Sequence, residues 1–320
     1  MISYNKRTLK IFAGNSNREL AKEICKYINI SLGETDISRF PDGEIKNKIE
    51  ESVRGQDVFI IQSTCPPVNE NLMELLIMID ALRRASADRI TAVIPYYGYA
   101  RQERKTRPRE PITAKLVANL LVSAGANRIL TMDLHAGQIQ GFFDIPVDQL
   151  ESVTILSNYF NEKNLDKVVV VSPDVGGTAR AREFAGRLKK PIAIIDKYRS
   201  SFDDVEIMHI VGEVKDKTVI IVDDIIDTAT SIIKGSQALL SAGAEEIYIC
   251  ATHPVFANPA LERIKKSFQD SLFKEVVVTN TIPVNNEKKF SGIKVLSVAE
   301  IFAEAIGRIH NNLSVSALFK

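Results

Sequence analysis

The sequence has few of the residues that build disulfide scaffolds, zinc sites or membrane spans. Its 320 residues include three cysteines, four histidines and no tryptophan. Cys25, Cys65 and Cys250 form no closely spaced pair, which argues against a disulfide framework or a zinc site and favours buried, reduced thiols. No apolar run approaches the roughly 18 residues that a spanning helix needs, and residues 1–7 lack the apolar stretch of a signal peptide. We therefore expect a cytoplasmic protein with no membrane partner.

The sequence also lacks an excess of charge of either sign. Its 41 Lys and Arg residues balance 40 Asp and Glu residues, for a net charge of +1. No global field attracts nucleic acid or a membrane surface, so any anion binding must come from local clusters. The 45% of hydrophobic and 25% of charged residues exclude a disordered or collagen-like chain. The length is ample for two domains.

Short apolar runs rich in β-branched residues alternate with longer helical patterns. Most of the runs show no polar alternation, which is typical of parallel strands buried on both faces. We expect strands at 9–13, 58–62, 90–95, 129–132, 168–172, 192–195, 218–222 and 247–251. We expect helices at 70–85, 114–123, 179–188 and 232–241. This alternation predicts an α/β fold with right-handed crossovers.

An internal echo indicates duplication. The pattern Ser-Ala-Gly-Ala, then Ile, then His begins at Ser123 and returns with the same spacing at Ser241, 118 positions later. Gly125 and Gly243 each have the place of a helix stop before a returning strand. Together with the length, the echo favours two similar domains joined near residues 146–154. His253, the second histidine of the echo, is interpreted as structural.

The most specific motif joins an apolar strand to acids and a hydroxyl-rich turn. Residues 218–222 run into Asp223 and Asp224, and residues 227–231 follow as Asp-Thr-Ala-Thr-Ser. At the carboxyl end of a parallel strand, such carboxylates can accept hydrogen bonds from a sugar diol or hold Mg²⁺ indirectly. The turn offers hydroxyls, backbone N–H groups and a helix N-terminus to a phosphate. The structural alternative is an acidic helix start with Thr228 or Ser231 as an ordinary N-cap.

Other segments have both a functional and a structural interpretation. Residues 101–109 hold five basic residues and one acid, which suits a mobile lid over a polyphosphate or a solvated loop, and Pro108 and Pro111 prevent a continuous helix. Asp133 and His135 follow a strand and suit a metal site or a structural role. Asp174 lies in a Gly-containing turn that can approach a phosphate or simply join a strand to a helix. Residues 40–44 suit a plain turn.

The motif at 218–231 resembles the phosphoribosyl-pyrophosphate binding motif, and the whole chain resembles class I ribose-phosphate pyrophosphokinases, the phosphoribosyl-pyrophosphate synthetase family. The matching stretches are 39–44, 71–87, 94–102, 111–119, 133–135, 138–146, 172–177, 196–197 and 251–254. The resemblance implies two tandem phosphoribosyltransferase-like α/β domains, each with a mainly parallel sheet flanked by helices. The first domain is residues 1–148, which contain the ATP-binding segments and the lid. The second domain is residues 149–320, which contain the ribose 5-phosphate site. The last ~20 residues of the chain are a candidate to pack back on the first domain.

The resemblance also implies a reaction, in which the pyrophosphoryl group of ATP passes to the 1-hydroxyl of ribose 5-phosphate and AMP leaves. It gives catalysis to Lys197 and Arg199, with Arg199 also contacting substrate, and makes Mg²⁺ the cofactor, held by His135, Asp174 and Asp133. It assigns ATP to Phe40, Asp42, Gly43, Glu44, Arg101 and Gln102, with residues 40–44 supplied by a neighbouring subunit. It assigns ribose 5-phosphate to Asp223, Asp224, Asp227, Thr228, Ala229, Thr230 and Ser231.

The same resemblance implies regulation and assembly. It makes phosphate an activator and ADP an inhibitor at a subunit interface, and it implies a hexamer assembled from dimers. The residues of this allosteric site are Ser52, Arg54, Ser86, Ser314, Ser316 and Phe319.

Three positions depart from the commonest family pattern. Thr230 stands where glycine is usual, Ser231 where threonine is usual, and Tyr198 where a basic residue is common. A β-branched residue at 230 is expected to resist a positive φ and to narrow the approach to the 5-phosphate. Two other functions stay open: a catalytically silent regulatory relative, and a phosphoribosyltransferase or an RNA-binding regulator on the same fold. Retention of Lys197, Arg199, His135 and the basic segment argues against the first alternative, and the doubled length argues against the second.

Overall fold

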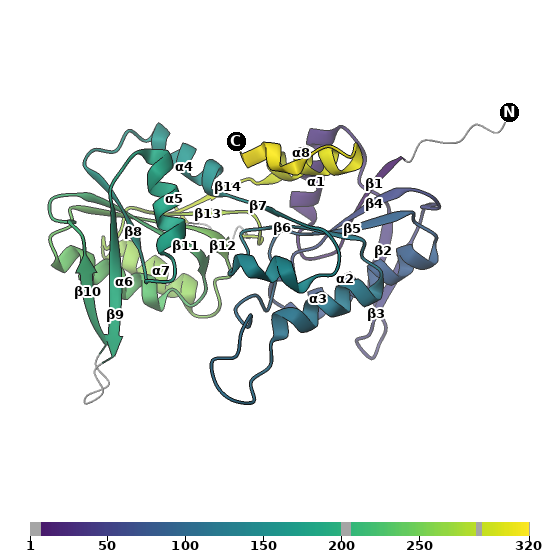
Figure 1. The fold of residues 1–320 in the computed structure, drawn as a ribbon, viewed down its shortest axis with the longest axis horizontal. Coiled ribbons are helices and arrows are strands. Elements are labelled where there is room, and N and C mark those ends of the chain that lie inside the picture. Colours follow the sequence, from purple (N-terminus) through teal and green to yellow (C-terminus); the bar gives the residue numbers. More distant parts are fainter. Residues whose placement is uncertain (1–7, 200–205, 286–289, 320) are drawn as a thin grey trace. The chain divides into compact units, whose positions relative to one another are not determined.

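The chain forms two compact units (Figure 1). The computed structural model describes residues 8–199, 206–285 and 290–319, and the side chains of all of these except 197–199, 206–207 and 319. Unit 1 contains the described residues up to Glu151, together with Thr281–Pro283 and those from Ser297 onward. Unit 2 contains the described residues of Ser152–Asn280 and Val284–Leu296.

Unit 1 is built on a five-stranded parallel sheet in the order β1-β4-β5-β6-β7. These strands are β1 (Leu9–Ala13), β4 (Asp57–Ile61), β5 (Arg89–Ile94), β6 (Arg128–Met132) and β7 (Val147–Leu150). A separate antiparallel hairpin pairs β2 (Thr35–Arg39) with β3 (Ile45–Ile49). Figure 1 shows α1 (Arg18–Ile28) and α8 (Ala299–His310) on one side of the sheet, and α2 (Val68–Arg84) and α3 (Thr113–Ala124) on the other. Two short 3₁₀ helices, η1 (Gly137–Phe142) and η3 (Val315–Phe319), complete the unit.

Unit 2 is built on a seven-stranded sheet in the order β10-β9-β8-β11-β12-β13-β14. Only the β9–β10 pair of this sheet is antiparallel. The strands are β8 (Val168–Ser172), β9 (Ile192–Arg199), β10 (Glu206–Val211), β11 (Thr218–Ile226), β12 (Glu246–Pro254), β13 (Glu275–Thr279) and β14 (Ile293–Leu296). The helices are α4 (Val153–Glu162), α5 (Thr178–Leu188), α6 (Thr230–Ser241) and α7 (Ala260–Gln269).

Strand β8 shows why continuous apolar runs become the centre of the sheet. Val168 and Val170 pack into a cluster with residues of α4 and α5. Val169 and Val171, on the opposite face, pack with residues of α6 and α7. Both faces are therefore buried, as parallel sheets covered by helices require. The α/β fold class expected from the sequence is confirmed.

The helix stops of the sequence echo are also confirmed. Gly125 follows α3 with a φ of 123°, and Gly243 lies just beyond α6 with a φ of 91°. Only glycine adopts this conformation without strain, so each glycine ends its helix before β6 or β12 begins. The three cysteines are buried, as predicted, and burial raises the pKa of the Cys25 thiol to about 11. Within the described ranges, no helix has both the length and the apolar character needed to cross a membrane.

Candidate functional site

The acidic residues of β11 lie where this strand extends beyond its neighbour. The pairing of β11 with β8 ends at Ile221, whereas its pairing with β12 continues to Ile226. The predicted strand end at residue 222 is therefore wrong, because β12 supplies hydrogen bonds along the acidic stretch as well. Asp223 and Asp224 thus lie beyond the last residue of β11 that pairs with β8, at the end of the sheet where α/β proteins bind ligands.

One arginine partly neutralises this acidic pair. Nη1 of Arg180, in the first turn of α5, lies 3.2 Å from Oδ1 of Asp224 and 3.5 Å from Oδ1 of Asp223. The Asp224 side chain is 6% exposed and that of Asp223 is 24% exposed. Burial, reinforced by the negative charge of Asp224, raises the pKa of Asp223 to about 8. Near neutral pH the pair therefore offers both a proton donor and acceptors, which suits binding of neighbouring hydroxyls.

Arg180 was not among the predicted site residues. The sequence did contain a signal, namely a basic residue in the first turn of a predicted helix. Its charge is unfavourable beside the positive end of the helix dipole unless an acidic residue pairs with it. The identity of that partner depends on folding, since Asp224 lies 44 positions away.

The turn after β11 presents the N-terminus of α6 without a side-chain cap. Helix α6 begins at Thr230, and its N-cap is Ala229, whose φ is 62°. No side chain accepts a hydrogen bond from the first turn at this cap, so the alternative of Thr228 or Ser231 as an ordinary N-cap is wrong. The expected strain at Thr230 is also wrong, because the left-handed conformation falls on Ala229. The turn keeps its backbone donors and exposed hydroxyls for an anion.

A second loop follows β8 and is shaped by Asp174. Oδ1 of Asp174 accepts a hydrogen bond from the Gly177 backbone N–H at 2.8 Å, and the Ser172 hydroxyl donates to the Asp174 carbonyl at 2.7 Å. A Cβ at Gly177 would lie 2.9 Å from the Ser172 hydroxyl oxygen, so a larger residue here would require the Ser172 side chain to move. The loop leads into α5 and leaves Asp174 exposed.

The predicted catalytic pair lies near the carboxyl end of β9. The pairing of β9 with β8 reaches Ile194, and Lys197 and Arg199 lie further along, opposite Met208 and Glu206 of β10. Their backbone belongs to β9, while their side chains and that of Tyr198 lie outside the described residues.

In unit 1, the predicted nucleotide and metal residues follow β5 and β6. Asp133 comes directly after β6 with a φ of 38°, and its N–H donates to the Leu150 carbonyl at 3.0 Å. His135 is exposed, whereas His253 is buried within β12, which supports the structural interpretation of His253. Arg101 is exposed beyond β5, and the side chain of Gln102 accepts a hydrogen bond from the Thr113 hydroxyl at the start of α3.

The basic segment after Arg101 forms an exposed loop with no helix, as the prolines predict. Glu110 holds the far end of this loop. Its Oε2 accepts hydrogen bonds from the Thr106 hydroxyl at 2.7 Å and from the N–H groups of Thr106 and Arg107 at 2.8 and 2.9 Å. These bonds lower the pKa of Glu110. Glu110 thus fixes the conformation of an exposed loop that carries several basic side chains.

Residues 40–44 form the tip of the β2–β3 hairpin, so the expectation of a turn is confirmed. The Phe40 N–H donates to the Glu44 carbonyl at 2.8 Å, and Gly43 has a φ of 96°. The Glu44 N–H donates to Oδ1 of Asp42 at 3.1 Å. Phe40 is 48% exposed, and the tip therefore presents an aromatic ring to its surroundings rather than to the core.

Three of the predicted effector residues, Ser52, Arg54 and Ser86, come shortly before the starts of β4 and β5. The Gly55 N–H, next to Arg54, donates to the Ser86 carbonyl at 2.8 Å. Asp57 and Arg89, which begin these strands, bind the end of α8 through His310 and the Ile309 carbonyl. The C-terminal segment continues from there, with the hydroxyls of Ser314 and Ser316 2.7 Å apart. The side chain of Phe319 lies outside the described residues.

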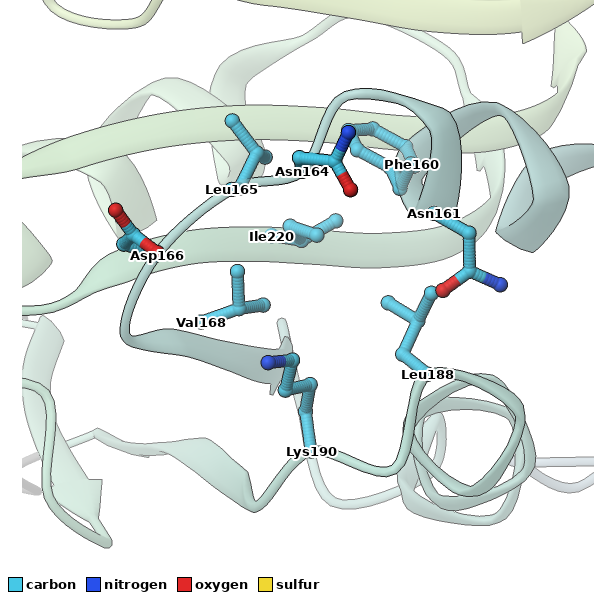
Figure 2. A pocket seen from close by; sticks show the side chains of 9 residues that line it. All are labelled: Phe160, Asn161, Asn164, Leu165, Asp166, Val168, Leu188, Lys190 and Ile220. Carbon is cyan, nitrogen blue, oxygen red and sulfur yellow. The ribbon is translucent and has the colours of Figure 1, made fainter.

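The candidate site at Asp223 and Asp224 coincides neither with a cluster of metal-binding side chains in the described residues nor with the pocket in Figure 2. No three His, Cys, Asp or Glu side chains form a metal-binding group in the described part of the chain. A pocket of about 300 Å³ lies among α4, the start of β8 and the end of α5, and Figure 2 shows the side chains that line it. Its lining includes Val168, Leu188 and Ile220, so it lies toward the amino end of β8, away from Asp223 and Asp224. Parallel sheets bind ligands at the other end.

Comparison with known proteins covers nearly the whole chain. Residues 9–125 match the model of the N-terminal domain of ribose phosphate pyrophosphokinase, and residues 199–320 match that of the phosphoribosyl synthetase-associated domain. A ribose-phosphate pyrophosphokinase from Clostridium tetani is 58% identical over 319 residues, 99% of this chain and 98% of the relative. One from Bacillus caldolyticus is 60% identical over 311 residues, 97% of this chain and 98% of the relative. The crystal structure of phosphoribosylpyrophosphate synthetase from Mycobacterium smegmatis matches with a TM-score of 0.90 at 44% identity, over 96% of this chain and 100% of that one.

Proposed function

The chain belongs to the ribose-phosphate pyrophosphokinase family, and on this basis we propose how its residues divide the work of the family's reaction. The protein is an enzyme that makes phosphoribosyl pyrophosphate from ATP and ribose 5-phosphate. The 1-hydroxyl oxygen of the sugar attacks the β-phosphorus of ATP and releases its proton. The bond between the β-phosphorus and the oxygen that bridges it to the α-phosphate breaks, and AMP leaves with that oxygen. The observation that carries the assignment of residues is the acidic strand end of β11 joined to the uncapped start of α6.

Ribose 5-phosphate binds along this strand end and turn. Asp223 and Asp224 face the ribose hydroxyls, because the pair can both accept and donate hydrogen bonds. Asp227 and residues 228–231 hold the 5-phosphate, since the start of α6 supplies N–H groups and a favourable dipole. Arg180 limits the repulsion within the acidic pair and so keeps both carboxyl groups oriented.

ATP binds through Arg101 and Gln102 and through Phe40, Asp42, Gly43 and Glu44 of a neighbouring subunit. The exposure of Phe40 at a hairpin tip supports a role outside its own fold, with the ring stacking on adenine. The cationic loop at 101–109 closes over the polyphosphate.

The residues suit Mg²⁺ held together with substrate rather than in a protein cage. Asp174 and Asp133 provide oxygen ligands, and His135 lies two residues from Asp133. A protein site of one or two carboxylates that is completed by substrate phosphates is usual for Mg²⁺. When bound, Mg²⁺ would neutralise part of the negative charge that develops on the phosphate groups during transfer.

Lys197 and Arg199 stabilise negative charge on the transferred group. No covalent enzyme intermediate is needed, because positioning and electrostatic stabilisation suffice for phosphoryl chemistry. Phosphate and ADP act at Ser52, Arg54, Ser86, Ser314, Ser316 and Phe319, and the assembly is a cytoplasmic hexamer.

Steady-state kinetics of the Lys197→Ala variant tests the catalytic assignment. The control is Lys265→Ala, which removes an exposed lysine of α7. We expect Lys197→Ala to lower kcat by about 10²–10³-fold, because one preorganised charge at the transferred group is lost. The KM for ATP should stay within about threefold of the parent. Lys265→Ala should behave as the parent. Comparable kcat values for the parent and Lys197→Ala would remove Lys197 from the mechanism.

A further inference from the structure

An arginine of α7 reaches the turn that precedes α6. Nη1 of Arg263 donates hydrogen bonds to the Thr230 hydroxyl at 2.6 Å and to the Thr228 carbonyl at 3.1 Å. The hydroxyl oxygens of Thr228 and Thr230 are themselves 3.2 Å apart. Helices α6 and α7 pack against each other, so Arg263 is fixed relative to the turn by the fold of unit 2.

This location is electrostatically unfavourable for a cation on its own. The N-terminus of α6 carries the positive end of the helix dipole, and its cap residue Ala229 contributes no side-chain acceptor. Across the part of the chain that the structure describes, no carboxylate lies within ion-pair distance of Arg263. The guanidinium and the helix start therefore add positive potential at one place, and an anion bound there would relieve the repulsion.

The same contact gives a role to the unusual residue at position 230. The threonine places a hydroxyl on the first residue of α6, and Arg263 holds that hydroxyl from the neighbouring helix. A glycine at this position would give Arg263 no side chain to hold. The second bond, to the Thr228 carbonyl, fixes the turn on the other side of Ala229.

We propose that Arg263 is a positioning residue for the 5-phosphate of ribose 5-phosphate, acting through Thr230 and Thr228. This inference rests on the proposed binding of ribose 5-phosphate at residues 227–231. Arg263 keeps the turn in its phosphate-binding shape before the substrate arrives, so that less ordering is needed on binding. Its effect is confined to the sugar phosphate, because ATP is assigned to residues of unit 1.

Steady-state kinetics of three variants tests the proposal. Arg263→Met removes both hydrogen bonds and keeps the aliphatic stem, Arg263→Lys keeps the charge, and Thr230→Val removes only the hydroxyl. Lys265→Met, on an exposed cation of the same helix, is the control for lost charge. We expect Arg263→Met to raise the KM for ribose 5-phosphate about tenfold or more, with the KM for ATP within about twofold of the parent. Arg263→Lys should restore part of the affinity, and Lys265→Met should change neither constant.

The double variant Arg263→Met/Thr230→Val tests the route of the effect. Its KM for ribose 5-phosphate should be well below the value expected if the two single effects multiplied, because both substitutions break the same hydrogen bond between Arg263 and Thr230. Three results would overturn the proposal. The first is a double variant whose effects multiply fully, and the second is an equal rise of both KM values in Arg263→Met. The third is a KM for ribose 5-phosphate that stays within twofold of the parent in both Arg263→Met and Thr230→Val. A parent protein that converts no ribose 5-phosphate would instead refute the proposed function.

Discussion

Asp223 has a carboxyl group whose pKa is raised by its position on the sheet. Its carboxyl group lies beside that of Asp224, with Arg180 as the counter-ion that the structure places against both. Burial raises the pKa of Asp223 to about 8. An unfolded chain would release this proton near the ordinary aspartate pKa of about 4. The folded state therefore retains a proton that the unfolded state loses between these two pH values.

This difference predicts how Asp223→Asn changes stability with pH. The unfolding free energy of the parent should fall as pH rises from about 4 to about 8, because the folded state binds more protons than the unfolded state in this window. The asparagine variant cannot ionise and escapes that loss. Below pH 4 the two proteins should be equally stable, and above pH 8 the variant should be more stable by about 0.5–2 kcal/mol. Urea unfolding at pH 4.0 and 8.5 measures the difference, and an unchanged difference at the two pH values would contradict the raised pKa.

For two arginines of the candidate site, the partner could not be predicted from the sequence. Arg180 and Arg263 act across 44 and 33 positions, on Asp224 and Thr230. Such pairs depend on how helices pack beside the sheet, and no local pattern specifies them. Asp223, Asp224 and the turn to Ser231 could be predicted, because strand, acids, hydroxyls and helix start are contiguous in the sequence.

Among the elements, a strand is found at each of the eight predicted places. Strands β1 and β8 have the predicted bounds, whereas β9, β11 and β12 continue beyond their predicted ends. The hairpin β2–β3, the edge strands β7, β10 and β14, and the buried strand β13 were not among the predicted strands. In β2 and β3 no residue is fully buried, and their polar residues alternate with only a few apolar ones. A half-exposed strand with so little apolar contrast has no clear sequence signal.

Helix α8 is tied to the sheet of unit 1 by a buried ion pair. Asp57 is fully buried, and Nε of Arg89 donates to its Oδ1 at 2.7 Å. Nδ1 of His310 lies 2.8 Å from Oδ2 of the same carboxylate, and Arg89 also donates to the Ile309 carbonyl at 2.9 Å. The pairing with Asp57 raises the pKa of Arg89. One carboxylate therefore joins the starts of two strands to the end of α8.

Loss of this carboxylate should destabilise the protein strongly. Asp57→Ala leaves Arg89 largely buried without its partner, which typically costs about 3–5 kcal/mol. Asp80→Ala is the matched control, because its pair with Arg84 is exposed on α2 and should contribute less than about 0.5 kcal/mol. Chemical denaturation of both variants gives the comparison. Equal, small losses in the two variants would show that α8 does not depend on Asp57.

At the scale of the molecule, the chain matches synthetases from end to end. The alternatives of a silent regulatory relative, a phosphoribosyltransferase and an RNA-binding regulator are not supported, because relatives that are 58–60% identical and align with 97–99% of this chain bear the name of the enzyme. The assignment of Phe40 to a neighbouring subunit's site remains a prediction, and it makes an oligomer necessary for activity.

Coexpression of two impaired variants, assayed at an ATP concentration too low for Phe40→Ala to turn over, tests that assignment. Phe40→Ala should weaken ATP binding, and Lys197→Ala should impair transfer. If each site takes Lys197 from one subunit and Phe40 from its neighbour, an equal random mixture should regain about a quarter of the parent activity. If Phe40 serves its own subunit, every site in the mixture carries one defect and activity should not recover. Separate tags and tandem purification ensure that the measured oligomers contain both variants.

The identity of the products shows whether the protein transfers a pyrophosphoryl group or a single phosphoryl group. The purified full chain is mixed with Mg²⁺, ATP and ribose 5-phosphate, and the phosphorus NMR spectrum is followed with time. We predict that AMP and a pyrophosphorylated sugar appear together in equal amounts, with no ADP. Formation of ADP with a singly phosphorylated product, or ATP that persists unchanged, would contradict the account.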